Sequence, residues 1–369
     1  MPDPRTRPRR SHSTPPVTAE GEAFRSDPTR LRHAAIPAPS RGSVSRAASG
    51  VLWGRIPLPI DLSRINVWLL DAPGGCIAVD TGMAVSMGKD AWEAIGAEVF
   101  ADKPLRGVFV THVHADHMGL AAWLQKRYGA PVTMSRRTFE QASSMLEGPT
   151  QAVLAQAERF FARHGLGDDA AHLLPMFRPE RSSRMTSGLP EVERFVADEE
   201  DLYCAPGWKA LQTDGHAEGH LCLWNESAGV LISGDQVLPS ISSNVSYGWR
   251  TLDPDPLGSY LESLRRLRRL PEDTLVLPAH GLPFYGLQQR IDDLLSHHEE
   301  QLERVLALCE RPRPAAELLS HLFRIKLKGV HLFLALGETV AHLEHLVLRG
   351  RMERFESAGA VHYAASAAQ

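Results

Sequence analysis

Three histidines and one aspartate lie within six consecutive positions of this chain, in the stretch His112-Val113-His114-Ala115-Asp116-His117. Residues 107–110 before it are apolar and β-branched, and residues 120–126 after it have a helical pattern, which predicts a strand-to-helix loop. Neutral imidazole and ionised carboxylate are good ligands for Zn, Fe or Mn. Only 17 of the 369 residues are His, so this density favours a metal site over unrelated surface histidines.

Four further polar side chains follow apolar, strand-like runs, at Asp80, His216, Asp235 and His280. Side chains presented at the ends of strands in a layered α/β domain converge on one edge, as a metal pocket requires. An aspartate such as Asp80 can accept the proton of a ligand imidazole and fix its tautomer, although the residue alone also fits a turn cap. The sequence therefore predicts one pocket built from distant segments.

The composition is that of an ordinary globular protein, with 43% hydrophobic and 23% charged residues. A net charge of −4 gives no overall attraction to nucleic acid or to an anionic membrane. No run of 18 apolar residues predicts a membrane span, and the N-terminus lacks an apolar signal-peptide core. The four cysteines show no paired spacing, so we expect no disulfide framework and a reducing cytoplasm.

The pattern along the chain divides it into three parts. Residues 1–50 are rich in Pro, Arg, Ser and Thr, which predicts a disordered tail. Residues 51–286 alternate strands and helices and include a mostly helical insertion at 136–190, which either covers the site or packs on the outside of the sheet. Residues 287–369 predict a long amphipathic helix, two further helices and a hairpin, the arrangement of a winged-helix-like module. In the long helix, His297 and His298 are expected on the surface.

The motifs, in this order, resemble those of the metallo-β-lactamase superfamily, whose fold is a four-layer αβ/βα sandwich. The resemblance covers about residues 51–285, and many members have Pro where this chain has Asp214. The complete ligand set is similar to that of dinuclear members of the glyoxalase II type. The C-terminal module resembles the winged-helix appendage of a subgroup that includes a mitochondrial lactamase-like endoribonuclease.

The resemblance implies two metal ions per chain, expected to be Zn, with Fe or Mn as alternatives. It assigns His112, His114 and His216 to the first ion, Asp116, His117 and His280 to the second, and Asp235 to both. Asp80 and His220 are expected to support ligands rather than to bind metal.

Such a centre lowers the pKa of bound water to about 7 and needs no Ser or Cys nucleophile. Asp116 is our candidate for passing a proton to the leaving group. Tyr247 and Trp249, in a Gly/Ser-rich loop after Asp235, are candidates for substrate contact, although they also fit ordinary loop aromatics.

The leading hypothesis is a hydrolase of a small thioester, lactone or ester. The alternative is an endonuclease for single-stranded RNA, which is not favoured because the basic residues of the C-terminal module are offset by acidic ones. A DNA-binding regulator with an inactive hydrolase domain and a mononuclear iron persulfide dioxygenase are further alternatives. Association into a homodimer is left open.

Overall fold

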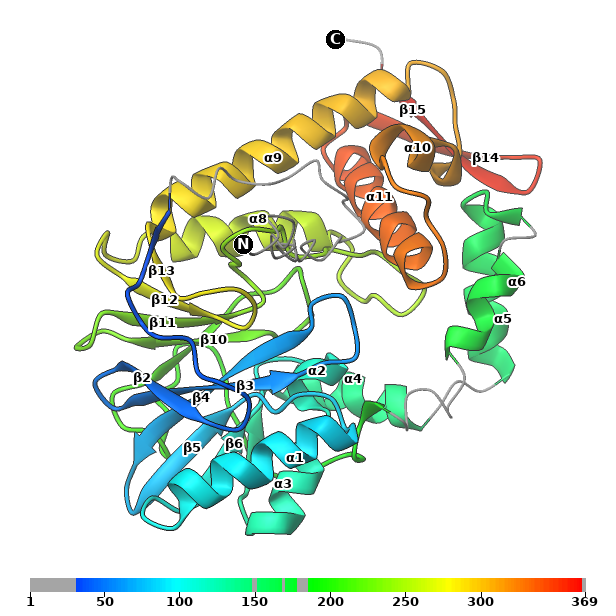
Figure 1. Cartoon of the computed structure of the whole chain (residues 1–369). Coiled ribbons are helices and arrows are strands. Elements are labelled where there is room, and N and C mark those ends of the chain that lie inside the picture. The colour runs from blue at the N-terminus through cyan, green and yellow to red at the C-terminus, as the bar shows by residue number, and fades with distance from the viewer. Residues whose placement is uncertain (1–30, 148–150, 168–169, 178–184, 367–369) are drawn as a thin grey trace, which may run out of the picture.

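Two β-sheets stacked face to face, with helices outside each, form the body of the protein (Figure 1). The computed structural model describes residues 31–147, 151–167, 170–177 and 185–366. Helices α1 (Ser86–Ile95) and α3 (Ala121–Tyr128) cover one sheet, and α8 (Pro256–Leu267) and α9 (Leu287–Leu308) cover the other. This is the four-layer αβ/βα sandwich that the resemblance implied.

Among the described residues, the larger sheet has seven strands, in the order in which they occur along the chain. Its strands are β2 (Val44–Ala48), β3 (Val51–Pro57), β4 (Arg64–Ala72), β5 (Gly75–Val79), β6 (Leu105–Phe109), β7 (Val132–Met134) and β8 (Val192–Phe195). The first four strands pair antiparallel, with a tight turn between β4 and β5. From β5 onward the strands run parallel, so that their C-terminal ends share one edge.

The smaller sheet has six strands in the order β1-β13-β12-β11-β10-β9. Its strands are β1 (Arg32–His33), β9 (Lys209–Gln212), β10 (Leu221–Asn225), β11 (Val230–Gly234), β12 (Leu275–Pro278) and β13 (Phe284–Tyr285). The parallel β11–β12 pair ends next to Asp235 and His280. Loops that follow strands of both sheets therefore carry the predicted ligands.

In the part of the chain that the structure describes, three hydrophobic cores hold the layers together. Between the sheets, Trp53 and Trp68 stack at 5.8 Å and pack with Phe109 and with residues of the second sheet such as Leu277. A second core lies under α1 and α3. The third begins between the smaller sheet and α8 and α9 and continues without a break into the C-terminal helices. The C-terminal part thus shares a hydrophobic core with the sandwich and is not joined to it by a linker alone.

The prediction of a disordered tail over residues 1–50 is wrong for residues 31–50, because strands β1 and β2 lie there. Arg32 pairs with Tyr285, and residues 44–48 pair with β3. Backbone hydrogen bonds to an existing sheet edge need few apolar side chains, so a composition rule for disorder missed these strands. Residues 1–30 lie outside the described part of the chain.

The C-terminal part contains α10 (Ala315–Leu322), α11 (Val330–Leu348) and a hairpin of β14 (Met352–Ser357) and β15 (Ala360–Ala365). The predicted helices and hairpin are present. Helix α9 spans both parts, because its first half covers the smaller sheet and its second half contacts α10 and α11.

The predicted helical insertion contains α4 (Arg136–Leu146), α5 (Gln151–Arg163), α6 (Ala170–Leu173) and the short 3-10 turn η3 (Leu174–Phe177). Helix α5 packs on the C-terminal part, where Phe161 lies 6.4 Å from Phe333 between ring centroids. In Figure 1, α5 and α6 lie beside α11 and β14, away from both sheets. Helix α5 therefore does not pack on the outside of either large sheet. Helix α4, in contrast, lies beside residues 113–118, with which it lines a pocket.

His297 and His298 were wrongly expected on the helix surface, since both are buried. His298 is fully enclosed, with Nδ1 3.2 Å from Nε2 of His342 and its ring edge-on to Tyr260. The face of α9 that carries them is covered by α11, a long-range contact that helical periodicity alone does not reveal.

Candidate metal centre

The loop after β6 carries four of the predicted ligands. The buried β6 strand ends at Phe109, and the short helix α2 (Ala115–Met118) begins after His114. This abrupt change from strand to helix turns His112, His114, Asp116 and His117 toward the shared end of the two sheets. All four side chains are largely or fully enclosed by protein.

The first group of donor atoms belongs to His112, His114, His216 and Asp235. Nε2 of His112 lies 2.9 Å from Nδ1 of His114 and 3.3 Å from Nε2 of His216. Nε2 of His216 lies 3.5 Å from Oδ2 of Asp235. Ligands bound at about 2.0–2.1 Å to a tetrahedral ion are about 3.3 Å apart, so this spacing suits one cation.

The second group consists of Asp116, His117 and His280. Oδ2 of Asp116 lies 3.3 Å from Nε2 of His280 and 3.8 Å from Nε2 of His117. Asp235 reaches this group as well, because its Oδ2 is 3.4 Å from Nε2 of His117 and its Oδ1 is 3.6 Å from Nε2 of His280. Asp235 thus lies between the two groups, in the position expected for a shared carboxylate.

Asp80 and Thr111 hold the ligand loop in place. Oδ2 of Asp80 lies 2.8 Å from Nδ1 of His117, and Oδ1 accepts the backbone N–H of Thr111 at 2.9 Å. The Thr111 hydroxyl lies within 3.0 Å of both Asp80 and Nδ1 of His112. With its Nδ1 engaged in this way, each imidazole directs Nε2 into the pocket.

Backbone carbonyls orient the two histidines that come from distant segments. The backbone oxygen of Asn244 lies 2.8 Å from Nδ1 of His216, and that of Arg64 lies 3.1 Å from Nδ1 of His280. Asn66 holds the His280 loop, because its amide donates to the backbone oxygens of Pro278 and Gly281 at 2.8 and 2.9 Å. Nε2 is therefore the atom that both histidines present to the pocket.

His220 lies behind the candidate ligands and belongs to neither donor group. It is fully buried, with Nδ1 2.8 Å from Oγ1 of Thr213 and Nε2 accepting the backbone N–H of Asp235 at 3.2 Å. Gly234 has φ +52°, and a Cβ there would lie 2.4 Å from Nε2 of His220. This geometry agrees with a supporting role and shows why the position before Asp235 is glycine.

The charges of the buried side chains suit a site for cations. Burial and the nearby His216 lower the pKa of His114 to about 3, and burial lowers the pKa of His112 well below its usual value. Burial also opposes ionisation of Asp235, but His117 and His280 outweigh it and hold the pKa of this carboxyl well below its usual value. His112 and His114 are thus neutral and Asp235 is ionised, the forms in which these groups bind metal. At His117 and His280, Asp235 and the other nearby carboxylates outweigh burial and raise the pKa, so these two rings would release a proton when they bind a cation.

Three atoms in the pocket show that the residues fit metal ions. Among the described residues, Nε2 of His117, Oδ1 of Asp235 and Nε2 of His280 are buried without a hydrogen-bond partner. Buried polar atoms of this kind are costly unless something binds them. All three point to the region between the two donor groups, where cations would satisfy them.

Tyr247 and Trp249 are not part of either donor group. The Trp249 ring packs with Phe161 at 5.4 Å and Phe333 at 6.0 Å between centroids, joining α5 to α11. The backbone N–H of Tyr247 donates to Gly337 at 2.9 Å. Both aromatics therefore serve the junction with the C-terminal part, and a contact with substrate stays a prediction.

Sequence reasoning missed the residues that orient the ligands. Thr111 could have been noticed, because it directly precedes the His-rich stretch. Asn66 and Asn244 carry no comparable signal, since each acts through amide or backbone contacts with segments far away in sequence.

Two stacked sheets with a His/Asp pocket at their shared edge define a metal-dependent hydrolase of the αβ/βα sandwich class. Residues 60–280 match the family model described as the metallo-β-lactamase superfamily, and residues 302–366 match the model for the metallo-β-lactamase-like C-terminal domain. The chain belongs to the metallo-β-lactamase superfamily and carries the C-terminal domain found with it.

The chain is similar to several proteins of known sequence or structure. A β-lactamase domain protein from Burkholderia ambifaria is 35% identical with a TM-score of 0.83, over 92% of this chain and 99% of that one. A metallo-β-lactamase family protein from Thermus thermophilus is 30% identical with a TM-score of 0.74, over 87% and 100%. The probable metallo-hydrolase YqjP of Bacillus subtilis is 28% identical over 79% of this chain and 90% of its own length.

Proposed function

We propose that this protein hydrolyses a small thioester, lactone or ester at a centre of two metal ions. The observation that carries the proposal is the position of Asp235 within 3.4–3.6 Å of Nε2 atoms from both donor groups. One carboxylate between two sets of ligands is the arrangement that holds two cations close together. We propose Zn as the metal, because imidazole nitrogens predominate in both sets.

When bound, two such cations supply a hydroxide at neutral pH and stabilise the oxyanion that forms at a carbonyl. The protein contributes the orientation of this centre. Asp80 and the backbone oxygen of Asn244 fix His117 and His216, and the buried sheet ends exclude bulk water. Asp116 is our candidate for passing a proton to the leaving group. Its Oδ2 faces His280, and we propose that its other oxygen carries the proton.

An apolar pocket beside the ligand loop supports a substrate with a hydrocarbon portion. Val113 and Ala115, which alternate with the ligands, line it together with Met118, Ala142, Met145, Leu146, Met185 and Thr186. Met and aliphatic side chains adapt to chains of different length. We propose that the acyl group lies here, with its carbonyl directed to the metal centre.

The decisive experiment combines metal analysis with a substrate screen on one preparation. We expect two Zn ions per chain and turnover of acyl-thioesters, lactones or simple esters that stops on chelation and returns with Zn²⁺. The Asp116→Asn variant should retain metal and lose turnover, and unchanged turnover would remove the proton-transfer role. No hydrolysis of any compound by the fully Zn-loaded protein would refute the proposal, and one Fe per chain with oxygen uptake would indicate a dioxygenase.

The RNA endonuclease remains the second candidate because three helices followed by the β14–β15 hairpin match the arrangement of a winged-helix module. The charges argue against it. Arg351 lies 2.7 Å from Glu303, and Arg354 lies 2.5 Å from Glu344, so both cations are already paired. A strongly salt-dependent gel shift with single-stranded RNA would favour this candidate over the small-molecule hydrolase.

A further inference from the structure

The metal ligand His216 depends on a segment that has no regular secondary structure. Its Nδ1 lies 2.8 Å from the backbone oxygen of Asn244, within the irregular stretch 236–255 between β11 and α8. Only while Asn244 keeps its position does the imidazole direct Nε2 toward His112 and Asp235. An irregular segment has no repeating backbone hydrogen bonds of its own, so contacts from another element must hold Asn244 in place.

The C-terminal helix α11 provides that support. The side-chain amide of Asn244 donates to Oε2 of Glu338 at 3.2 Å, and the backbone N–H of Tyr247 donates to the backbone oxygen of Gly337 at 2.9 Å. The hydroxyl of Ser246 donates to Oδ1 of Asn244 at 2.6 Å, which fixes the side chain in the direction of Glu338. Two consecutive residues of α11 therefore hold the stretch that contains Asn244.

Gly337 allows the close approach. A Cβ at this position would lie 2.8 Å from Oγ and 2.9 Å from Cβ of Ser246, closer than side chains tolerate. Glycine in the middle of a helix costs about 1 kcal/mol relative to alanine, so its presence in α11 indicates that contact with the loop matters at this point. The missing side chain at position 337 thus lets α11 and the segment 236–255 touch at this point.

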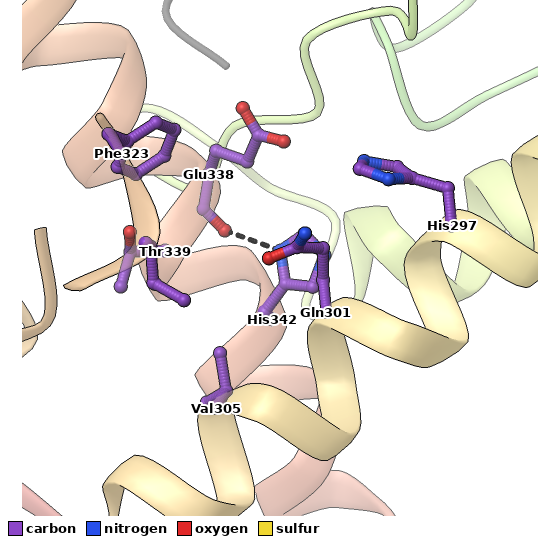
Figure 2. Close-up of a pocket in the computed structure, with 8 residues that line it drawn as sticks. His297, Gln301, Val305, Phe323, Glu338, Thr339 and His342 are labelled. Carbon is purple, nitrogen blue, oxygen red and sulfur yellow. Dashed lines mark hydrogen bonds between the residues drawn. The ribbon is translucent and has the colours of Figure 1, made fainter. Parts of the chain in front are cut away.

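Glu338 is 4% exposed, and burial of a carboxylate requires polar partners. Figure 2 shows it at the edge of a pocket between α9 and α11, with its carboxylate directed away from His342. Its backbone oxygen meets Nδ1 of His342 at 2.8 Å, a contact made within the helix. The side chain thus extends from α11 toward the Asn244 segment.

We propose that Glu338 and Gly337 are positioning residues for the metal centre, acting through Asn244 on His216. The C-terminal domain then contributes to the geometry of the metal centre. This inference rests on the proposed metal centre but not on any particular substrate. It is tested by metal retention, which needs no turnover.

The experiment measures the rate at which a chelator removes Zn²⁺ from Glu338→Ala, Glu338→Gln and Asn244→Ala, and the visible absorption of the Co²⁺-loaded proteins. Loss of a partner that orients a ligand weakens metal binding about 10–100-fold, and we expect about tenfold faster release in the two alanine variants. The Gln side chain can still accept from the Asn244 amide, so Glu338→Gln should release metal at nearly the rate of the unaltered protein. The Co²⁺ spectrum should change in the alanine variants only.

Glu300→Ala, at an exposed position on α9, is the matched control and should leave release and spectrum unchanged. Because Glu338 and Asn244 are proposed to act in one chain of contacts, the double alanine variant should be no faster than either single one. Unaltered release from folded Glu338→Ala, or effects that multiply in the double variant, would overturn the proposal. If Glu338→Ala does not fold, the metal-release rates of Asn244→Ala and Glu338→Gln test the proposal. A substrate screen without turnover would not affect this test, because metal release is measured without a substrate.

Discussion

Oδ2 of Asp80 lies 2.8 Å from Nδ1 of His117, while the other oxygen of the same carboxylate accepts the backbone N–H of Thr111. The contact joins the end of β5 to the ligand loop that follows β6. Asp80 adopts φ +62°, in the left-handed region that Asp and Asn tolerate better than most residues. An aspartate at position 80 therefore suits both the backbone conformation and the two hydrogen bonds that its carboxylate makes.

Asp80→Asn should keep the backbone but weaken metal binding. The amide can still accept from Thr111, but it presents an NH2 group to Nδ1 of His117 and no longer fixes that ring. We expect Zn²⁺ to bind about 10–100-fold more weakly, measured by competition with a chromophoric chelator. Asp71→Asn, which breaks an exposed ion pair with Lys103, is the control and should bind Zn²⁺ normally. Equal affinity of Asp80→Asn and the unaltered protein would contradict this role.

His220→Ala distinguishes support from ligation. Removing a fully buried ring leaves a cavity and an unpaired Asp235 N–H, so we expect the free energy of unfolding to fall by about 2–4 kcal/mol. Urea denaturation measures this change. Metal content at saturating Zn²⁺ should stay the same, whereas His216→Ala should lose bound metal. Loss of an equal amount of metal from both variants would make His220 a ligand.

Asp255 links stability to pH at the junction between α8 and α11. Its Oδ1 accepts the backbone N–H of Gly258 at 2.8 Å and lies 2.8 Å from Nδ1 of His345. Burial opposes ionisation, but the bonds from His345 and Gly258 outweigh it and lower the pKa of Asp255 below 3.8. A lowered pKa in the folded state adds stability above the unfolded value, and this stability is lost as the pH falls through the folded value.

Asp255→Asn keeps the helix cap but removes the charge. We expect the variant to be about 1–2 kcal/mol less stable than the unaltered protein at pH 6–7, and this difference to shrink as the pH falls below about 3.8. Urea denaturation at a series of pH values measures it. A difference that does not change with pH would show that the carboxylate is not responsible.

Met145→Ala tests the proposed acyl pocket. Met145 lines the pocket and is 41% exposed, so its truncation should hardly affect stability. Loss of about one to two methylene contacts corresponds to about 1 kcal/mol, so we expect KM for a long-chain acyl-thioester to rise about fivefold. KM for an acetyl-thioester should not change. An equal effect on both substrates would place the acyl chain elsewhere.

No helix in the described part of the chain is long and apolar enough to cross a membrane. The hydrophobic residues of α9 and α11 instead pack against each other and against the smaller sheet.

The alternation of strands and helices and the types of the candidate ligands could be predicted from local sequence, whereas the four-layer sandwich was implied by the family resemblance. Strands β5, β6, β11 and β12 are short apolar runs, and each is followed at once by the polar residues that the site needs. Strand formation and the polarity of the residues that follow are local properties, and parallel strands place their ends at one edge. Hence Asp80, the 112–117 stretch, Asp235 and His280 could be assigned to one pocket before the structure was known.

The contacts that orient the candidate ligands and connect α11 to the Asn244 segment became visible only in the folded chain. Asn244 and Glu338 are 94 residues apart and meet because α11 packs on an irregular segment. The burial of His298 and the pairing of β1 with β13 also depend on partners far away in sequence. Contacts of this kind leave no periodic signal, because they depend on how whole elements pack and not on the pattern within one of them.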